Sequence, residues 1–254
     1  MSTFIIAEIG SAWRFGRSNA QHHRNALEAI DVAKQCGANA IKFQWTSDPR
    51  AMEKRRKVKR GSYDILAWPR EWLEDFHEAC ALRKIEFMVT VFLEKDVPVI
   101  APYVSRFKVA SLESEDHELI ACMREFKKEV IVSHGASSGG LLPRVKNLHC
   151  TAAYPASAET LNLLAITSGY DGYSDHSRNT ITGALAVACG ATVVETHFRL
   201  RTTPLLNPEY RHSLSRDMLL EYVCNIRMAE SMLGDGKKKV EPSERWALKH
   251  KVQS

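Results

Sequence analysis

Two histidines at the ends of apolar segments are the first residues in this sequence whose type and spacing could do chemistry. His176 lies in the stretch GYSDHSRNT, and His197 follows 21 residues later in VVETHFRL. Two neutral imidazoles on adjacent strands suit a divalent metal such as manganese or zinc, with a carboxylate or substrate oxygen completing the shell. A buried histidine can equally be a core residue beside a carboxylate, so the two histidines alone leave both interpretations open.

Further polar residues stand at the ends of segments that otherwise have the composition of buried strands. A parallel strand covered on both faces is normally an unbroken apolar run, and burying polar groups without a function is costly. Lysines combined with hydroxyl groups suit a phosphate or carboxylate ligand. We therefore predict an anion-binding site where these strand ends meet. The residues concerned are Lys42, Gln44, Thr90, Lys108, Ser111, Glu113, Ser133, His134, Ser174, Asp175 and Glu195.

The elements that must position these residues alternate between short β-rich segments and longer amphipathic ones. Helical patterns with capping signals occupy residues 22–37, 69–84 and 180–190. Alternation of this kind indicates a parallel sheet with right-handed crossovers. Eight such units in about 250 residues is the size of a TIM (β/α)8 barrel, in which the active site lies at the C-terminal ends of the strands. We predict a single barrel domain over residues 1–254. The predicted strands are residues 3–10, 39–45, 86–92, 106–112, 129–135, 147–153, 171–176 and 192–198.

Composition narrows the class of protein further. The 254 residues are 44% hydrophobic and 26% charged, with no apolar run long enough for a membrane span and no signal-like N-terminus. Six scattered cysteines favour reduced, buried thiols and a cytoplasmic location. Residues 46–68 form a charged and irregular connection that includes the basic run EKRRKVKR at 53–60. That run is interpreted as a solvated loop or as a surface that attracts anions. Because no aromatic residues alternate with the basic ones, it does not indicate nucleic-acid binding.

Several motifs, in order along nearly the whole chain, resemble those of one enzyme family. CGANAIKFQ is similar to GADAVKFQ, FKVASLE to FKIASxE, and VIVSHGAS to VILSTGMA. LHCTAAYPA, GYSDHS and GATVVETHF are similar to LHCTSxYPx, GYSDHT and GAxxIEKHF. These are motifs of the sialic acid synthase family, TIM-barrel enzymes that condense phosphoenolpyruvate with an aldehyde sugar.

The resemblance implies roles at matching positions. His176 and His197 would hold a divalent metal, manganese first, with magnesium, cobalt or zinc as alternatives. Gln44 and Tyr154 would lie near the reacting centre and the sugar, and Glu209 of LLNPEYRHSL would orient the aldehyde partner in place of the aspartate of GPDHxxSL. We expect Glu113 to manage the proton of the attacking water, so the predicted catalytic residues are Glu113, Gln44 and His197. Phosphoenolpyruvate would be bound by Lys42, Thr90, Lys108, Ser133 and Ser174, and Ser111 joins the predicted substrate-binding set.

The expected activity is a metal-dependent synthase that gives a 2-keto acid and phosphate. Its partners would be phosphoenolpyruvate and a small aldehyde, with no nucleic acid or membrane, and a homodimer is left open. Two alternatives remain: a metal-dependent aldolase or lyase of another class on the same barrel, and a non-catalytic relative that binds an anionic sugar or a partner protein.

Three departures from the family pattern bear on the substrate. Trp13 and Arg14 replace the asparagine and histidine of NHxG, and Arg201 replaces the acid of TLDR. The sequence ends at Ser254, so we expect a barrel without the antifreeze-like domain that covers the sugar in relatives. An altered polar lining changes substrate preference. We therefore expect an aldehyde other than N-acetylmannosamine, and the added arginines hint at a more anionic one.

Overall fold

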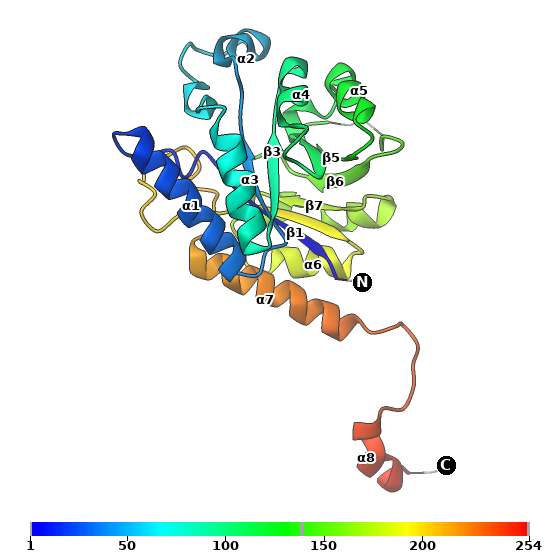
Figure 1. Cartoon of the computed structure of the whole chain (residues 1–254). Coiled ribbons are helices and arrows are strands. Elements are labelled where there is room, and N and C mark those ends of the chain that lie inside the picture. The colour runs from blue at the N-terminus through cyan, green and yellow to red at the C-terminus, as the bar shows by residue number, and fades with distance from the viewer. Residues whose placement is uncertain (1, 138–139, 253–254) are drawn as a thin grey trace.

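Eight parallel strands close into a barrel in the order in which they occur along the chain (Figure 1). The structure is a computed structural model that describes residues 2–137 and 140–252. All eight predicted strands are present within two or three residues of their expected ends, and the predicted fold class is confirmed. The strands are β1 Phe4–Gly10, β2 Ala40–Gln44, β3 Glu86–Thr90, β4 Arg106–Val109, β5 Glu129–His134, β6 Lys146–Cys150, β7 Gly172–Asp175 and β8 Val193–His197.

Helices cover the outside of the barrel, and their ends carry the expected signals. In α1 the Ser18 side chain accepts a hydrogen bond from the backbone of Gln21, which satisfies one free N–H of the first turn. None of the described helices is both long and apolar enough to cross a membrane. Figure 1 shows the chain after α7 leaving the barrel and ending in the short α8. The helices are α1 Asn19–Gln35, α2 Pro49–Arg56, α3 Trp72–Arg83, α4 Val97–Ile100, α5 His117–Glu125, α6 Thr182–Ala188, α7 Arg216–Leu233 and α8 Arg245–His250.

The connections differ from the expected alternation in three places. The described residues between β5 and β6 contain no helix, and β6 is joined to β7 through two 3₁₀ segments, Ala158–Thr160 and Leu163–Ser168. The segment 46–68, predicted to be irregular, contains α2 instead. Asp48 caps this helix by accepting from the backbone of Ala51 at 3.0 Å, and Pro49 occupies its first turn. A capping residue followed by proline is a helix-start signal. The prediction of an irregular segment was wrong because it overlooked this signal.

The barrel interior changes from apolar to polar along the strands. A closed apolar layer fills its N-terminal part and contains Ile6, Ala40, Met88, Ile131, Leu148 and Val193. Successive side chains of a strand point to opposite faces, so the residue two positions further on points into the same interior. In that next layer stand Glu8, Lys42, Thr90, Ser133, Cys150 and Glu195. The pleat of the strands therefore places these polar side chains together in one layer, directly above the layer of packed apolar side chains.

Trp13 and Arg14, which depart from the family pattern, have structural partners. Trp13 is fully buried, donates from Nε1 to the Gly10 carbonyl at 3.0 Å, and packs against a cluster that includes Phe43 and Trp68. The Arg14 guanidinium donates to the carbonyls of residues 65 and 67, at 3.2 and 3.3 Å. Both residues therefore fasten the segment 46–68 to the chain that leaves β1.

Candidate active site

A cavity of about 220 Å³ opens at the C-terminal ends of the strands. This is the end of a (β/α)8 barrel at which active sites are built. Most of the residues predicted from the sequence line it: Lys42, Gln44, Lys108, Ser111, Ser133, Tyr154, Ser174, His176, His197 and Glu209. Thr90 lies directly behind this lining, where its hydroxyl accepts from Lys42 Nζ at 2.8 Å.

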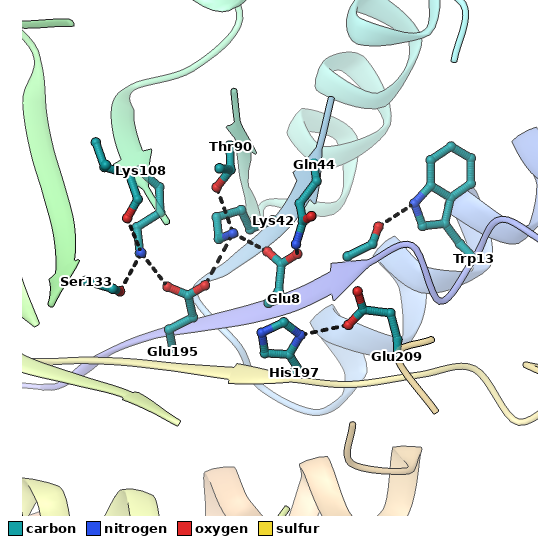
Figure 2. Close-up of polar contacts among 12 residues, drawn as sticks. Glu8, Trp13, Lys42, Gln44, Thr90, Lys108, Ser133, Glu195, His197 and Glu209 are labelled. Carbon is teal, nitrogen blue, oxygen red and sulfur yellow. Dashed lines mark hydrogen bonds and ion pairs between the residues drawn. The ribbon is translucent and has the colours of Figure 1, made fainter. Parts of the chain in front are cut away.

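A buried network of lysines and glutamates forms the inner end of the cavity (Figure 2). Lys42 forms ion pairs with Glu8 and, at 3.3 Å, with Glu195 Oε1. Lys108 Nζ lies 3.1 Å from Glu195 Oε2 and donates to Ser133 Oγ at 2.6 Å. Because each lysine is at most 3% exposed, each needs a carboxylate or an anionic ligand to balance its charge. Glu195 therefore joins the two lysines into one charge-balanced unit.

The pKa values in this network follow from burial and from the neighbouring charges. Burial lowers the pKa of Lys42, but the charges of Glu195 and Glu8 outweigh this effect, and its pKa lies above the ordinary value. Burial lowers the pKa of Lys108, and the nearby charge of Lys42 lowers it further. Burial raises the pKa of Glu195, but the two lysines outweigh burial and hold the pKa well below its ordinary value.

His176 and His197 lie side by side at the ends of β7 and β8, with their ring centroids 5.2 Å apart. His176 Nδ1 donates to the Thr151 carbonyl at 2.9 Å, and His197 Nδ1 lies 2.9 Å from Glu209 Oε2 (Figure 2). Within the described residues no hydrogen bond involves Nε2 of either ring. In metal-binding histidines, one ring nitrogen usually donates to an oxygen while the other ring nitrogen is left available for the metal.

Burial sets the protonation of His176, whereas a carboxylate sets that of His197. Burial lowers the pKa of His176 to about 3, so its imidazole is neutral near pH 7. Burial also lowers the pKa of His197, but the hydrogen bond that it donates to Glu209 outweighs burial, and the pKa lies above the ordinary value. His197 therefore holds its proton on the side of Glu209.

Glu113 is the predicted catalytic residue that the structure places outside the cavity. Its carboxylate accepts from Arg56 Nε at 3.0 Å and also contacts Arg56 Nη2. It lines an adjoining hollow instead. The role of Glu113 in handling a proton of water therefore stays a prediction, and it would require a shift of this side chain.

Sequence reasoning placed Glu195 among the strand-end residues without a role of its own, and it counted Arg56 only within the basic run 53–60. It did not single out Glu8 or His212, although these residues also belong to the site. Glu8 accepts from Gln44 Nε2 at 2.9 Å, and His212 Nε2 lies 2.9 Å from Glu209 Oε2. A signal was available for the two glutamates, since each stands two residues after an interior apolar position of its strand. His212 lies in the turn region between β8 and α7, and Arg56 is the last residue of α2, so no strand periodicity points either of them to the cavity.

Comparisons of sequence and comparisons of fold both point to the same family of proteins. The profile of the NeuB family matches residues 29–238. Pseudaminic acid synthase of Campylobacter jejuni strain 81-176 is 31% identical over 98% of this chain and 79% of its own length. Human N-acetylneuraminate-9-phosphate synthase is 27% identical over 95% of this chain and 74% of its own. The crystal structure of N-acetylneuraminic acid synthetase from Leptospira borgpetersenii, in complex with citrate, covers 98% of this chain and 91% of its own, with 25% identity and a TM-score of 0.81.

Proposed function

Because the chain belongs to the NeuB family, we propose that it condenses phosphoenolpyruvate with a sugar-like aldehyde to give a 2-keto acid and phosphate. The observation that carries this proposal is one cavity lined by two lysines, three serines and three histidines. A substrate without a phosphate or carboxylate group would have no need of this combination. The residues of the anion site are Lys42, Lys108, Ser133 and Ser174.

The inner end of the cavity suits the phosphate and carboxylate of phosphoenolpyruvate. Lys42 and Lys108 are held by Glu8, Glu195 and Ser133, so their ammonium groups are positioned before a ligand arrives. Preorganised donors in a site closed off from water interact more strongly with a bound anion than the same groups do in water. Ser133 from β5 and Ser174 from β7 add hydroxyl donors to the cavity.

The family resemblance implies a divalent metal, and the residues present fit one. His176 and His197 would hold it through Nε2, because both Nδ1 atoms are already bound to oxygens. Such an ion, manganese first and magnesium, cobalt or zinc as alternatives, would polarise the aldehyde oxygen as a Lewis acid. Glu209 would orient the His197 ring in the way that outer carboxylates do in metal sites.

The chain's own residues then bring the two substrates together. The lysines fix phosphoenolpyruvate so that its C3 faces the aldehyde carbon, and positioning of this kind supplies a large part of the rate enhancement. The new bond joins these two carbons, while the C2–C3 double bond of phosphoenolpyruvate and the aldehyde C=O double bond become single bonds. The aldehyde oxygen takes up the proton that the added water releases. Water adds to C2, and phosphate leaves with the oxygen that bridged it to C2. Gln44 lines the cavity and donates to Glu8, and it would hold the aldehyde at the reacting centre.

Calorimetric titration of phosphoenolpyruvate tests the proposal most directly. Metal-stripped protein is titrated with and without manganese, together with His176→Ala and Lys108→Met. We expect the wild type to bind, Lys108→Met to lose binding, and His176→Ala to lose the effect of manganese. Thermal melting of each variant separates loss of the site from loss of folding. Absence of phosphoenolpyruvate binding under every metal condition would overturn the proposal.

A further inference from the structure

Positive charge is concentrated in the segment 46–68, which joins β2 to α3 and contains α2. This segment has seven basic and three acidic residues, a net charge of +4, and the whole chain has a net charge of +5. The segment begins at the rim of the cavity, because β2 ends at Gln44 and Gln44 lines the cavity. Figure 1 shows α2 at the opposite end of the barrel from the N-terminus. Most of the chain's net charge therefore lies beside the cavity mouth.

Four cations of this segment have no carboxylate partner among residues 2–137 and 140–252. All four side chains are exposed, and they belong to the last turn of α2 or to the chain just after it. We name them the basic cluster: Lys54, Lys57, Lys59 and Arg60. The other basic residues of the segment are paired, Arg50 with Glu53 and Asp64, Arg55 with Asp116, and Arg56 with Glu113.

The basic cluster adjoins the cavity by way of two neighbouring surface hollows. The first hollow shares Arg56 and Tyr63 with the wall of the cavity. The second hollow shares Val58 with the first, and three of the four residues of the basic cluster line it. An anion that reaches the basic cluster from solvent is therefore next to a series of hollows that leads to the cavity.

The cations at the inner end of the cavity contribute little attraction at long range. Lys42 pairs with Glu8 and Glu195. Lys108 pairs with Glu195, so the network of two lysines and two glutamates is neutral. At distances well beyond the separation of a pair, the field of the cation is largely cancelled by that of its carboxylate. At contact distance the ammonium groups still donate hydrogen bonds to a bound anion. The network is therefore suited to holding an anion that has already arrived.

Unpaired cations on the surface act over a distance that the salt concentration controls. The Debye length is about 30 Å at 0.01 M ionic strength and about 8 Å at physiological ionic strength. At low salt the field of the basic cluster therefore extends over the neighbouring cavity mouth. Surfaces of one sign of charge beside a cleft raise the association rate of an oppositely charged ligand by about 10- to 1,000-fold.

We propose that the basic cluster guides the anionic substrate to the cavity. It raises the rate at which phosphoenolpyruvate arrives and takes no part in holding it. Lys42 and Lys108 hold the anion once it is inside. This inference rests on the proposed function for the identity of the anion. It assigns arrival and retention to different residues, so the association and dissociation rate constants should respond to different substitutions.

Stopped-flow mixing of phosphoenolpyruvate with manganese-supplied protein measures the two rate constants. Tryptophan fluorescence is followed, since Trp45 stands next to Gln44 of the cavity wall. The test variant combines Lys54→Gln, Lys57→Gln, Lys59→Gln and Arg60→Gln. In 10 mM chloride we expect its association rate constant to be about tenfold below that of the wild type, and in 500 mM chloride less than about twofold below. Its dissociation rate constant should stay within about twofold, so the Kd from calorimetry should rise with the loss of association rate.

A control variant removes the same number of charges from other parts of the surface. Its substitutions are Lys84→Gln, Lys127→Gln, Lys237→Gln and Lys238→Gln, all at exposed positions. Lys84 and Lys127 precede β3 and β5, at the end of the barrel away from the cavity. We expect this variant to associate with phosphoenolpyruvate as the wild type does, and thermal melting shows that both variants are folded.

The outcomes separate this inference from the proposed function. An equal fall of the association rate constant in both variants would show that only net charge matters, and would overturn the inference. A faster dissociation in the test variant would show that the basic cluster contacts the ligand, and would also overturn it. An unchanged association rate constant in the test variant would overturn this inference alone. If phosphoenolpyruvate did not bind to the wild type, the proposed function and this inference would fail together.

Discussion

Glu209 accepts from His197 through one carboxylate oxygen, with His197 Nδ1 2.9 Å from Oε2. The same oxygen lies 2.9 Å from His212 Nε2, so the carboxylate is held between two imidazoles. Burial raises the pKa of Glu209, but the two histidines outweigh burial and keep the pKa far below its ordinary value. His212 would therefore act on the proposed metal site through Glu209. It lies two positions beyond the histidine of the family's GPDHxxSL pattern, where this chain has Tyr210.

Removing the His212 imidazole should weaken metal binding. His212→Ala leaves Glu209 with one partner and loosens the orientation of the His197 ring. Loss of such an outer partner typically costs 10- to 100-fold in metal affinity, and we expect about that loss for manganese in calorimetry. His212→Gln, which retains an N–H donor near the position of Nε2, should recover most of the affinity.

The exposed His117, at the start of α5, supplies a control for this series. His117→Gln should bind manganese as the wild type does. If His212→Gln bound as weakly as His212→Ala, then His212 would be a direct ligand rather than a positioning residue. The cluster His197, Glu209 and His212 has ligand atoms within 4.8 Å of one another and could hold an ion by itself. Electron paramagnetic resonance of bound Mn²⁺ would count the coordinated imidazoles and decide the matter.

Gly10 gives Glu209 the space that it occupies. A Cβ at Gly10 would lie 2.6 Å from Glu209 Oε1, and the backbone there has a φ of +50°. Gly10→Ala should therefore both strain the backbone and displace the carboxylate. Gly190→Ala, at a φ of +104° with no atom within 4 Å, provides strain without crowding. We expect thermal denaturation to show a loss of about 1–2 kcal/mol for the control and a larger loss for Gly10→Ala, with weakened manganese binding in Gly10→Ala alone.

The sequence was sufficient to predict the barrel and most of the strand residues that face its mouth, because both follow from strand periodicity. His134 and Asp175 were predicted there too, but they do not line the cavity and instead bond to Asn147 and Tyr222. Lys42 and Gln44 stand two apart, as do Glu195 and His197, and the pleat brings each pair to one face. What could not be predicted is how the charges pair. Whether Lys42 is balanced by Glu8 or by a ligand depends on the register between β1 and β2, which opposes Glu8 to Lys42.

Loop residues were beyond sequence reasoning for a different reason. The loop that carries Glu209 is fixed by Asn207, which donates to the Ser11 carbonyl at 3.1 Å and accepts from the Glu209 backbone. The contact with Ser11 joins residues 196 positions apart, and no local sequence pattern predicts it. Arg56 is likewise directed at the cavity by Glu113, its partner from the end of β4.

Acid should destabilise the protein through Glu195. Its pKa in the folded state lies below the value of about 4.5 of an ordinary glutamate, so the folded state favours the ionised form. The contribution to stability is therefore complete above about pH 4.5 and is lost as the pH falls below that value toward the folded-state pKa. In urea titrations at pH 5.0, 4.0 and 3.0, Glu195→Gln should lose less free energy of unfolding across this range than the wild type. Parallel curves would show that other carboxylates govern acid unfolding.

Binding of phosphoenolpyruvate should be accompanied by proton uptake. Lys42 and Lys108 are balanced by Glu8 and Glu195 before any ligand arrives, so an incoming anion adds uncompensated negative charge to a buried, neutral unit. Like charges raise the pKa of a carboxylate, and Glu195, which pairs with both lysines, should respond by binding a proton.

Calorimetry of metal-stripped protein in buffers of different ionisation enthalpy measures this uptake. We expect a net uptake of up to about one proton near pH 7, and a smaller uptake when manganese is present, because the cation then supplies part of the compensating charge. Glu8→Gln serves as the comparison: with one carboxylate removed, Lys42 is left to balance the ligand, so the variant should take up fewer protons and bind phosphoenolpyruvate more tightly. An observed binding enthalpy that is the same in every buffer would contradict the predicted proton uptake. The two lysines would then exchange their glutamate partners for the ligand without any change in protonation.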